Sequence, residues 1–347
     1  MRSNGGKGGR TLTLLLPGLL DGLASTQGTP VLEKSNAPEL KLILARSATK
    51  QETADTADAL LFELFAIQIP NTDVPVAPVT YALDSDKTGL DDSYWLRADP
   101  VYLRADRDAI VLAEYLGLHL NTDEANQFTR EISAHFASDH WHLEVPVPQR
   151  WYLRLPENPG MHTHPLSEVI GKSIKNHLPY GPKEMAWHAW LTELQMLLHN
   201  SPVNQQRENR GEHPVNSLWF WGGGQCPKIP KVDWAQLWSD DPTALGLANL
   251  AGVPRTGAPV NGEAWLHEAI TPGRHLVVLE EWRNIFAEHS FHQRNEMQEM
   301  NQRWFSPLLK ALKSGQLESL TLYPLNGQSF YLTAARARHW WKRKYRT

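Results

Sequence analysis

The spacing of apolar and polar positions predicts strands alternating with helices at both ends of the chain. Thr11–Leu16 has the pattern of a buried strand that turns at Pro17-Gly18, and Ala54–Phe65 has the spacing of an amphipathic helix. Further on, the pattern predicts a helix at Pro242–Ala251, a strand at His275–Leu279, a long helix at about 291–313 and a strand at Leu317–Tyr323. This alternation favours a parallel sheet covered on both faces.

The middle third mixes short strands and helices, which is typical of an α+β arrangement. The pattern predicts a strand at Tyr94–Leu103 that is interrupted or ends near Pro100, and a helix from the N-cap Thr122 to Phe136. It also predicts two short strands around a proline turn at 141–155, a helix at Pro182–His199 and a strand at Val215–Trp221. On the Pro182–His199 helix, an apolar stripe is formed by Trp187, Leu191, Leu194 and Leu198.

These patterns predict an α/β protein with a doubly wound core and an inserted lobe. The core is expected at residues 10–90 plus 205–335, and the α+β lobe at residues 91–204. Residues 1–9 are rich in glycine and are expected to be flexible, whereas residues 336–347 form a basic C-terminal tail. The tail interleaves cations with Trp340 and Trp341, so it either touches an acidic partner or nucleic acid, or forms a solvated end.

Length and composition narrow the class of protein. The chain has 347 residues, a net charge of −4 and 41% hydrophobic residues, which predicts a folded chain of one or two domains. The charge balance argues against a dedicated nucleic-acid binder. The single cysteine, Cys226, excludes an intrachain disulfide and any Cys-based metal site, and it fits a reducing compartment.

The N-terminal apolar run does not have the form of a targeting signal. Leu12–Leu20 is broken by Pro17-Gly18 and is followed at once by Asp21, without a small-residue cleavage site. No stretch approaches 18 apolar residues, so no membrane span is expected. We therefore expect a cytoplasmic protein that does not associate with a membrane.

A glycine-rich segment is the strongest candidate for anion binding. The expected strand Val215–Trp221 runs into Gly222-Gly223-Gly224, and glycine lets backbone N–H groups approach an anion closely. Arg207 and Arg210 lie just upstream and have the planar fork that binds phosphate or carboxylate. The alternative is a tight turn with two solvated arginines.

Other polar pairs carry weaker signals. His140-x-His142 and His162-x-His164 each have the spacing that puts two imidazoles on one face of a strand, although 15 histidines make such pairs expected by chance. On the Pro182–His199 helix, His188 and His199 share a polar face. Glu280-Glu281 is either an acid–base pair or a helix N-terminal charge bias.

One run of residues resembles a known family. Its pattern is N-x-x-R-x-x-x-G-x-x-P-x-N-x-x-W-x-W-G-x-G, formed by Asn204, Arg207, Gly211, Pro214, Asn216, Trp219, Trp221, Gly222 and Gly224. It resembles a signature of the archaeal-type, cofactor-independent phosphoglycerate mutases of the alkaline phosphatase superfamily. A nearer resemblance is to a proteobacterial phosphoglycerate-mutase-like (RpfE-type) group of regulatory proteins.

Four further segments resemble the same family in the same order, so the resemblance covers roughly residues 75–330. Trp95–Asp99 is similar to the family's "AFRxN" strand with aspartate in place of asparagine, and Asp123–Ala125 is similar to the start of its next helix. Arg150–Tyr152 and Leu178–Gly181 are similar to its "YRH" strand and "LPxG" turn. The resemblance implies an alkaline-phosphatase-like core and a substrate clamp that includes Arg97 and Arg150.

The departures from the family concern its catalytic positions. Members that catalyse hold two divalent metals through Asp and His and use a Ser or Thr nucleophile. The positions corresponding to two ligand sets are Pro17-Gly18 and Asn326-Gly327, and the nearest match to the nucleophile is Thr56-Ala57-Asp58. Asp21 and Thr56 are conceivable shifted groups, although Thr56 also fits a helix cap.

The resemblance and its departures together predict a phosphoglycerate-mutase-related protein with a degenerate metal centre. It is expected to bind a small phosphorylated or carboxylate metabolite, and to act as a binding or regulatory protein with a possible protein partner. No cofactor or metal is expected. Its anion-binding residues are expected to be Arg97, Arg150, Asn204, Arg207, Asn216, Gly222, Gly223 and Gly224.

Two alternatives remain open. The first is an active metal-dependent mutase or phosphatase that holds Mn or Zn through shifted ligands such as Asp21, Glu280 and His289, and uses Thr56 as its nucleophile. The second is a pure interaction protein that uses a tryptophan-rich surface and the basic tail. The sequence leans against enzymatic activity without excluding it.

Overall fold

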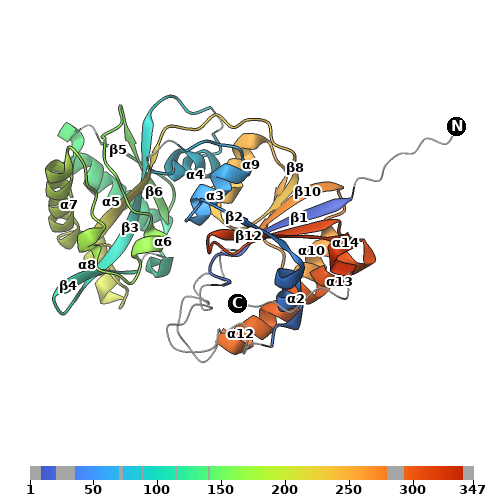
Figure 1. Cartoon of the computed structure of the whole chain (residues 1–347). Coiled ribbons are helices and arrows are strands. Elements are labelled where there is room, and N and C mark those ends of the chain that lie inside the picture. The colour runs from blue at the N-terminus through green and yellow to red at the C-terminus, as the bar shows by residue number, and fades with distance from the viewer. Residues whose placement is uncertain are drawn as a thin grey trace. The chain divides into compact units, whose positions relative to one another are not determined.

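The computed structural model describes residues 9–20, 36–69, 73–87, 89–114, 116–139, 141–279 and 293–338. The chain divides into two compact units, each with its own sheet (Figure 1). Unit 1 consists of Met1–Ala66 and Ile229–Thr347, and unit 2 consists of Ile67–Lys228. Unit 2 is thus inserted into the sequence of unit 1.

Unit 1 holds a mainly parallel sheet in the order β2-β12-β11-β1-β10-β8-β9. Within the described residues, β1 runs parallel to both β10 and β11, whereas β12 is antiparallel to β11 and β2. The strands are β1 (Arg10–Leu15), β2 (Ala48–Gln51), β8 (Trp234–Trp238), β9 (Arg255–Thr256), β10 (Gly273–Val278), β11 (Ser319–Tyr323) and β12 (Gln328–Thr333).

Helices cover both faces of this sheet. The helices are α2 (Pro38–Arg46), α3 (Ala57–Leu64), α9 (Pro242–Ala251), α10 (Gly262–Glu268), α12 (Gln293–Met300), the π-helical turn η5 (Asn301–Phe305), α13 (Ser306–Ser314) and α14 (Ala334–Arg338). Figure 1 shows α3 and α9 on one side of the sheet and α2, α10 and α13 on the other. Leu12 and Leu14 of β1 pack with Trp304 and Leu308 in the main core. The predicted α/β architecture is confirmed, and its finer alkaline-phosphatase-like details stay a prediction.

Unit 2 holds an antiparallel sheet in the order β4-β3-β6-β5, with β7 also paired to β3. The strands are β3 (Tyr94–Asp106), β4 (Ala109–Glu114), β5 (His142–Val147), β6 (Arg150–Leu155) and β7 (Ser217–Gly224). The helices are α4 (Val76–Asp84), α5 (Thr122–His135), α6 (Leu166–Val169), α7 (Glu184–His199) and α8 (Pro202–Asn209), with short turns η2 (Leu116–Leu118), η3 (Ala137–Asp139) and η4 (Ile174–Asn176).

The two faces of the unit 2 sheet differ in what covers them. The predicted apolar stripe of α7 is buried, and it packs with Phe128 of α5 and Leu153 of β6 in one core. On the other face, Tyr81 of α4 packs with Trp95 and Tyr152 of the sheet. Helix α4 therefore covers a face of mixed aromatic and polar character.

The unit boundaries differ from those expected at residues 90 and 205. Residues 67–90 and 205–228, expected in the core, lie in unit 2. The reason is that β7 pairs with β3, with Trp221 opposite Arg97, and does not join the parallel sheet. Helix α4 packs on both β3 and β7 and is held in the same unit.

Two local expectations also need correction. The strand β3 continues through Pro100, where it pairs with β7 alone, because β6 pairs only with residues 94–97 and β4 only with residues 102–106. A proline is tolerated there since that side of the strand needs no donor. Helix α5 is capped by Asn121 and not by Thr122, in a capping box with Glu124.

Among the helices that the structure describes, none combines the length and apolar character that crossing a membrane requires. The flexible segment predicted at residues 1–9 and the basic tail at 336–347 fall largely outside the described residues. Arg336 and Arg338 are described, and both lie in α14.

Candidate functional site

A layer of polar side chains lies between α4 and the sheet of unit 2. In the strand register, Arg97 of β3 is opposite Tyr152 of β6 on one side and Trp221 of β7 on the other. Because side chains alternate along a strand, Asp99 shares the face of Arg97, and Arg150 shares the face of Tyr152. Helix α4 contributes Thr80 and Asp84 to the same layer.

Arg97 is enclosed on all sides by protein groups. Its Nε and Nη2 donate to Asp99 Oδ1 at 3.1 and 2.7 Å, and its Cζ lies 5.4 Å from the ring centre of Tyr152 and 5.1 Å from that of Trp221. The second oxygen of Asp99 accepts a 2.7 Å hydrogen bond from Trp221 Nε1. Burial opposes the charged form, but the attraction of Asp99 outweighs it, so the pKa of Arg97 is raised.

Arg150 is the more accessible of the two predicted clamp residues. Its Nε donates to Asp84 Oδ2 at 2.7 Å, and its Nη2 donates to Asp84 Oδ1. The Arg150 side chain is 28% exposed, compared with 7% for Arg97. Burial lowers the pKa of Arg150, but the hydrogen bonds and the charge of Asp84 raise it further, so the net shift is upward.

Tyr152 joins the two arginine pairs. Its hydroxyl donates to Asp84 Oδ2, and its ring lies 5.4 Å from the Arg97 guanidinium. Burial is the main cause that raises the pKa of Tyr152. The phenol therefore stays protonated at neutral pH and can serve as a hydrogen-bond donor in this layer.

Further cations lie at the rim of the layer. Lys87 Nζ donates to Tyr81 Oη at 3.1 Å, and the Tyr81 hydroxyl donates to Glu144. Arg154, two residues after Tyr152 on β6, is 40% exposed, pairs with Asp91 and lies 5.9 Å from the ring of Trp95. The rim therefore presents positive groups to solvent, each with a carboxylate or phenol nearby.

The other predicted anion-binding residues occupy structural positions. Arg207 is 1% exposed and donates to the Leu118 and His213 carbonyls and to Glu124 Oε2 at 3.0 Å. The side chain of Asn204 accepts from the N–H of Val215 and donates to its carbonyl. The side chain of Asn216 does the same with the N–H and the carbonyl of Leu103. Their role in binding stays a prediction.

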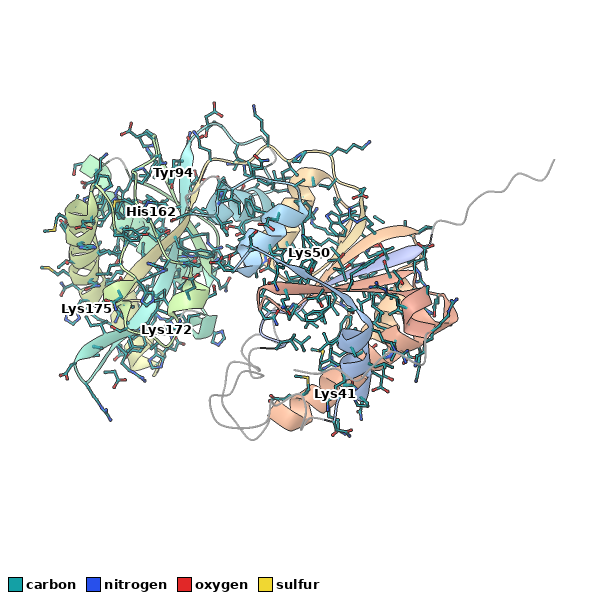
Figure 2. The ribbon with its side chains drawn as sticks, viewed as in Figure 1. Lys41, Lys50, Tyr94, His162, Lys172 and Lys175 are labelled. Carbon is teal, nitrogen blue, oxygen red and sulfur yellow. The ribbon has the colours of Figure 1, made fainter. Side chains whose placement is uncertain are left out.

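The triple glycine lies inside β7 and does not form a loop at the end of a parallel strand. A Cβ on Gly223 would lie 2.4 Å from Tyr94 Oη, and one on Gly224 would lie 2.4 Å from Pro75 Cβ. Tyr94 is labelled in Figure 2. Gly222 has φ +65°, which a glycine adopts readily. The glycines therefore allow the close approach of β7 to α4 and β3.

Thr56 caps a helix in unit 1. It is the N-cap of α3, and its Oγ1 accepts a 3.2 Å hydrogen bond from the N–H of Ala59. Burial of Ala57 and the capped first turn hold this segment in place. The interpretation of Thr56 as a capping residue is confirmed, while a catalytic role for its hydroxyl stays untested.

The carboxyl ends of β1 and β11 meet at one edge of the unit 1 sheet, where the resembling family holds metal. Leu16 N donates to Tyr323 O at 2.9 Å, and Gly18 N donates to Pro324 O at 3.2 Å. The described residues here include Pro17-Gly18 and Asn326-Gly327, whose side chains supply no carboxylate or imidazole.

A carboxylate does lie beside this edge. Glu52 N donates to Gly327 O at 2.9 Å, and its carboxylate is held by Ser329 Oγ at 2.6 Å and by Lys50 Nζ at 3.1 Å (Figure 2 labels Lys50). Within the described ranges, no group of three or more His, Cys, Asp or Glu side chains could hold a metal ion. These residues thus do not fit a two-metal centre, while Asp21, Glu280, Glu281 and His289 lie outside the described residues.

The histidine pairs do not form a metal site within the described residues. His162 and His164 both lie near the ring of Tyr180, and each has a carboxylate 3.6 Å from Nδ1, on Asp73 and Glu168 respectively. His140 lies outside the described residues. On α7, His188 bonds the Pro179 carbonyl, so it fixes the start of the helix.

Thr80, Asp84 and Tyr152 belong to the polar layer but were not predicted as site residues. The alternation Arg150-x-Tyr152-x-Arg154 was a usable signal, because three polar residues at a spacing of two mark a polar face of a strand. No such signal marked Asp84, which lies at the last turn of a largely apolar helix.

The chain is similar to phosphoglycerate mutases over part of its length. A Geobacter sulfurreducens protein named "Probable 2,3-bisphosphoglycerate-independent phosphoglycerate mutase" is 29% identical over 135 residues, covering 38% of this chain and 34% of that protein. The 2,3-bisphosphoglycerate-independent phosphoglycerate mutase of Methanosarcina barkeri is 27% identical over 120 residues, covering 34% of this chain and 30% of that protein. The matches thus span about a third of these curated relatives. No protein-family model matches the chain.

A solved structure shares the fold. The PH0037 protein from Pyrococcus horikoshii aligns with 94% of this chain and 88% of its own, at a TM-score of 0.50 and 14% sequence identity. At this identity the likeness concerns the fold alone. The relationship to the cofactor-independent phosphoglycerate mutases, at modest identity, rests on the sequence matches.

These relatives correct the prediction that the chain needs no metal or cofactor. The matched proteins are named 2,3-bisphosphoglycerate-independent phosphoglycerate mutases, and the resemblance described above implies two divalent metals in the members of that family that catalyse. The absence of a metal requirement is therefore not supported. A test of metal dependence must include Mn and Zn, since the candidate ligands Asp21, Glu280 and His289 are outside the described residues.

Proposed function

We propose that this chain is a phosphoglycerate-mutase-related protein that binds a small phosphorylated or carboxylate metabolite through unit 2 and acts as a binding or regulatory protein. Arg150 makes the direct contact with the anion. Arg97 acts as a positioning residue, because it is enclosed by Asp99, Tyr152 and Trp221. The resemblance to the RpfE-type regulatory group supports the regulatory part of the proposal.

The observation that carries the proposal is the partial exposure of Arg150 above a fixed polar layer. Nε and Nη2 of Arg150 are held by Asp84, and 28% of the side chain is exposed, so part of its set of five N–H groups can reach an external acceptor. The neighbouring cations Lys87 and Arg154 add positive potential at the rim. Such a surface favours an acid with more than one negative charge.

The binding role is favoured over catalysis by the chemistry of the described residues. Metal-assisted phosphoryl transfer needs an activated hydroxyl and metal ligands. Thr56 Oγ1 is used as a helix cap, and Pro17 and Asn326 stand where ligands would be expected from the resemblance. A metal at the sheet edge is compatible with the proposal, since a bound ion without an activated nucleophile does not complete the reaction.

The test measures binding and turnover on the same preparation, with Mn or Zn added and with metal removed. 3-Phosphoglycerate and inorganic phosphate should raise the melting temperature of the chain, since a ligand at 100 times its Kd stabilises by about 2.7 kcal/mol. Arg150→Ala should abolish this stabilisation. Arg130→Ala, which removes an exposed arginine of α5 on the other face of the sheet, is the control and should retain the stabilisation.

Turnover distinguishes the proposed binding protein from the alternative of an active enzyme. We expect no conversion of 3-phosphoglycerate above background with Mn or Zn. Turnover that is lost in Thr56→Ala or Asp21→Ala would establish the active enzyme with shifted ligands and overturn the proposal. Binding that survives Arg150→Ala would move the site away from the polar layer.

A further inference from the structure

Asp84 occupies the side of Arg150 that is best suited to bind a ligand. Its two oxygens accept from Nε and Nη2 of Arg150, which is the paired geometry that guanidinium groups form with carboxylates and phosphates. Asp84 is 2% exposed, so the protein holds this carboxylate within the polar layer. Its Oδ2 also accepts from the Tyr152 hydroxyl, which fixes its orientation.

We infer that Asp84 is an internal competitor that lowers the affinity of Arg150 for anionic ligands. This inference rests on the proposed function and concerns the affinity of the same site. An external anion and Asp84 cannot both take the N–H pair of Nε and Nη2. While Asp84 holds that pair, an external anion is left with the N–H groups of Nη1, the second N–H of Nη2 and a guanidinium whose charge is already compensated.

The same geometry determines the class of ligand that can compete. A single carboxylate has the same charge as Asp84 and must also meet the negative field of Asp84 itself. A phosphate dianion on an organic acid has a larger Coulomb attraction to Arg150 and can use Lys87 at the rim for its second acidic group. The site therefore selects phosphorylated acids over simple carboxylates.

The structure offers a matched control for this competition. On β6, four residues after Arg150, Arg154 donates from Nη2 to Asp91 and from Nε to Ser93 Oγ at 2.9 Å, and the Asp91 side chain is 55% exposed. Asp84→Asn and Asp91→Asn remove the same charge from neighbouring arginine pairs. Only Asp84→Asn frees an N–H pair that is held inside the layer.

The experiment measures the dissociation constants of 3-phosphoglycerate, inorganic phosphate and acetate by calorimetry with the full chain. We expect Asp84→Asn to tighten 3-phosphoglycerate binding at least tenfold, and Asp91→Asn to change it less than twofold. Acetate should bind the unchanged chain far more weakly than 3-phosphoglycerate, and Asp84→Asn should narrow that gap. Adding Arg150→Lys to Asp84→Asn should abolish the gain, because lysine lacks the planar fork.

Asp84→Ser is a second variant that leaves a hydroxyl acceptor for Tyr152. If neither Asp84 variant folds, Asp84 is a structural counter-ion and the inference is overturned. Equal effects of Asp84→Asn and Asp91→Asn, or weaker binding in Asp84→Asn, would overturn it too. If the unchanged chain binds through Arg150 and Asp84→Asn brings no gain, only the inference fails. If Asp84→Asn binds while the unchanged chain does not, the inference stands and the proposed function fails.

Discussion

The two units bury different kinds of polar group. Among the described residues, the buried polar side chains of unit 1 are neutral: Thr13, Ser239, Thr243, His275, Asn301, Ser319 and Ser329. Unit 2 buries charges as well, namely Arg97, Asp99, Glu124 and Arg207. The difference follows the architecture, because the unit 1 sheet is covered by apolar faces of helices, whereas α4 and α8 bring polar groups onto the sheet and helices of unit 2.

This contrast separates a structural charge from one that can serve a ligand. A buried charge is stable only when it is paired and hydrogen-bonded. Arg207 meets that condition entirely within the protein, whereas Arg150 meets it on one side and faces solvent on the other. Exposure and pairing, and not residue type, therefore decide which arginine is a candidate for binding.

The largest effect on stability is expected from removing a buried charge in unit 2. Arg207→Met should lower the free energy of unfolding by about 3–5 kcal/mol, because Glu124 loses a buried partner and two carbonyls lose their donor. Chemical denaturation measures this. Arg210→Ala, which removes a 45% exposed arginine near the same Glu124, is the control and should cost well under half as much. Equal costs would contradict the distinction between the two arginines.

A smaller effect is expected from a buried neutral group in unit 1. Asn301 Oδ1 accepts from Leu40 N at 3.0 Å, and its Nδ2 donates to Glu39 Oε2 at 2.6 Å. Asn301→Leu should cost about 1–3 kcal/mol, because the Leu40 N–H is left without this partner. The same denaturation measurement compares it with Arg207→Met. A larger cost than that of Arg207→Met would break the contrast between the units.

The helix cap at Thr56 should contribute less to the free energy of unfolding than either of these buried polar groups. Thr56→Ala should destabilise by about 1 kcal/mol, since the Ala59 N–H loses its acceptor. Thr56→Ser keeps a hydroxyl and should restore most of the loss. A change in ligand binding without a change in stability would show that Thr56 does more than cap α3.

The smallest effect is a pH dependence in unit 1. Burial lowers the pKa of His275, while its hydrogen bond to the Thr271 carbonyl opposes this shift. The unfolded imidazole, with an ordinary pKa near 6.5, therefore binds a proton more readily than the folded one. Stability from this group is present above pH 6.5 and is lost as the pH falls from 6.5 towards the lower folded pKa, at no more than about 1.4 kcal/mol per pH unit.

His275→Gln should remove this part of the pH dependence. The measurement is the difference in unfolding free energy between the two chains from pH 7.5 to pH 5. Trp238 Nε1 donates to His275 Nδ1 at 3.2 Å, which already requires an unprotonated Nδ1 in the folded state. A difference that grows in favour of the unchanged chain at low pH would contradict the burial of a neutral imidazole.

Much of the local structure could be predicted from the sequence. Helix α9 has the predicted bounds, the buried stripe of α7 consists of the predicted residues, and β1, β10 and β11 lie close to their predicted places. These features depend on periods of two and 3.6 residues, which neighbouring residues determine by themselves. The predicted type of fold, α/β with an inserted part, rests on the same periods.

The composition of the site could be predicted only in part. Arg97 and Arg150 were identified by resemblance, and Asp99 lies two residues from Arg97 on the same strand. The contacts of Asp84 with Arg150 and Tyr152 join elements up to 68 residues apart. The glycine segment was expected to form an anion loop, because its sequence alone does not show which strand β7 would join. In the structure, the glycines serve the close packing of β7.

The sequence by itself thus determined which segments become strands and helices and which face of each is apolar. The tertiary structure decided that β7 pairs with β3, that unit 2 begins at Ile67, and that Arg207 is sealed against Glu124, 83 residues away, while Arg150 keeps an exposed side. The physical reason is the distance along the chain over which each kind of interaction acts. Backbone preference and hydrophobic period act over a few residues, whereas strand pairing and the burial of a charge depend on partners brought together by the whole fold.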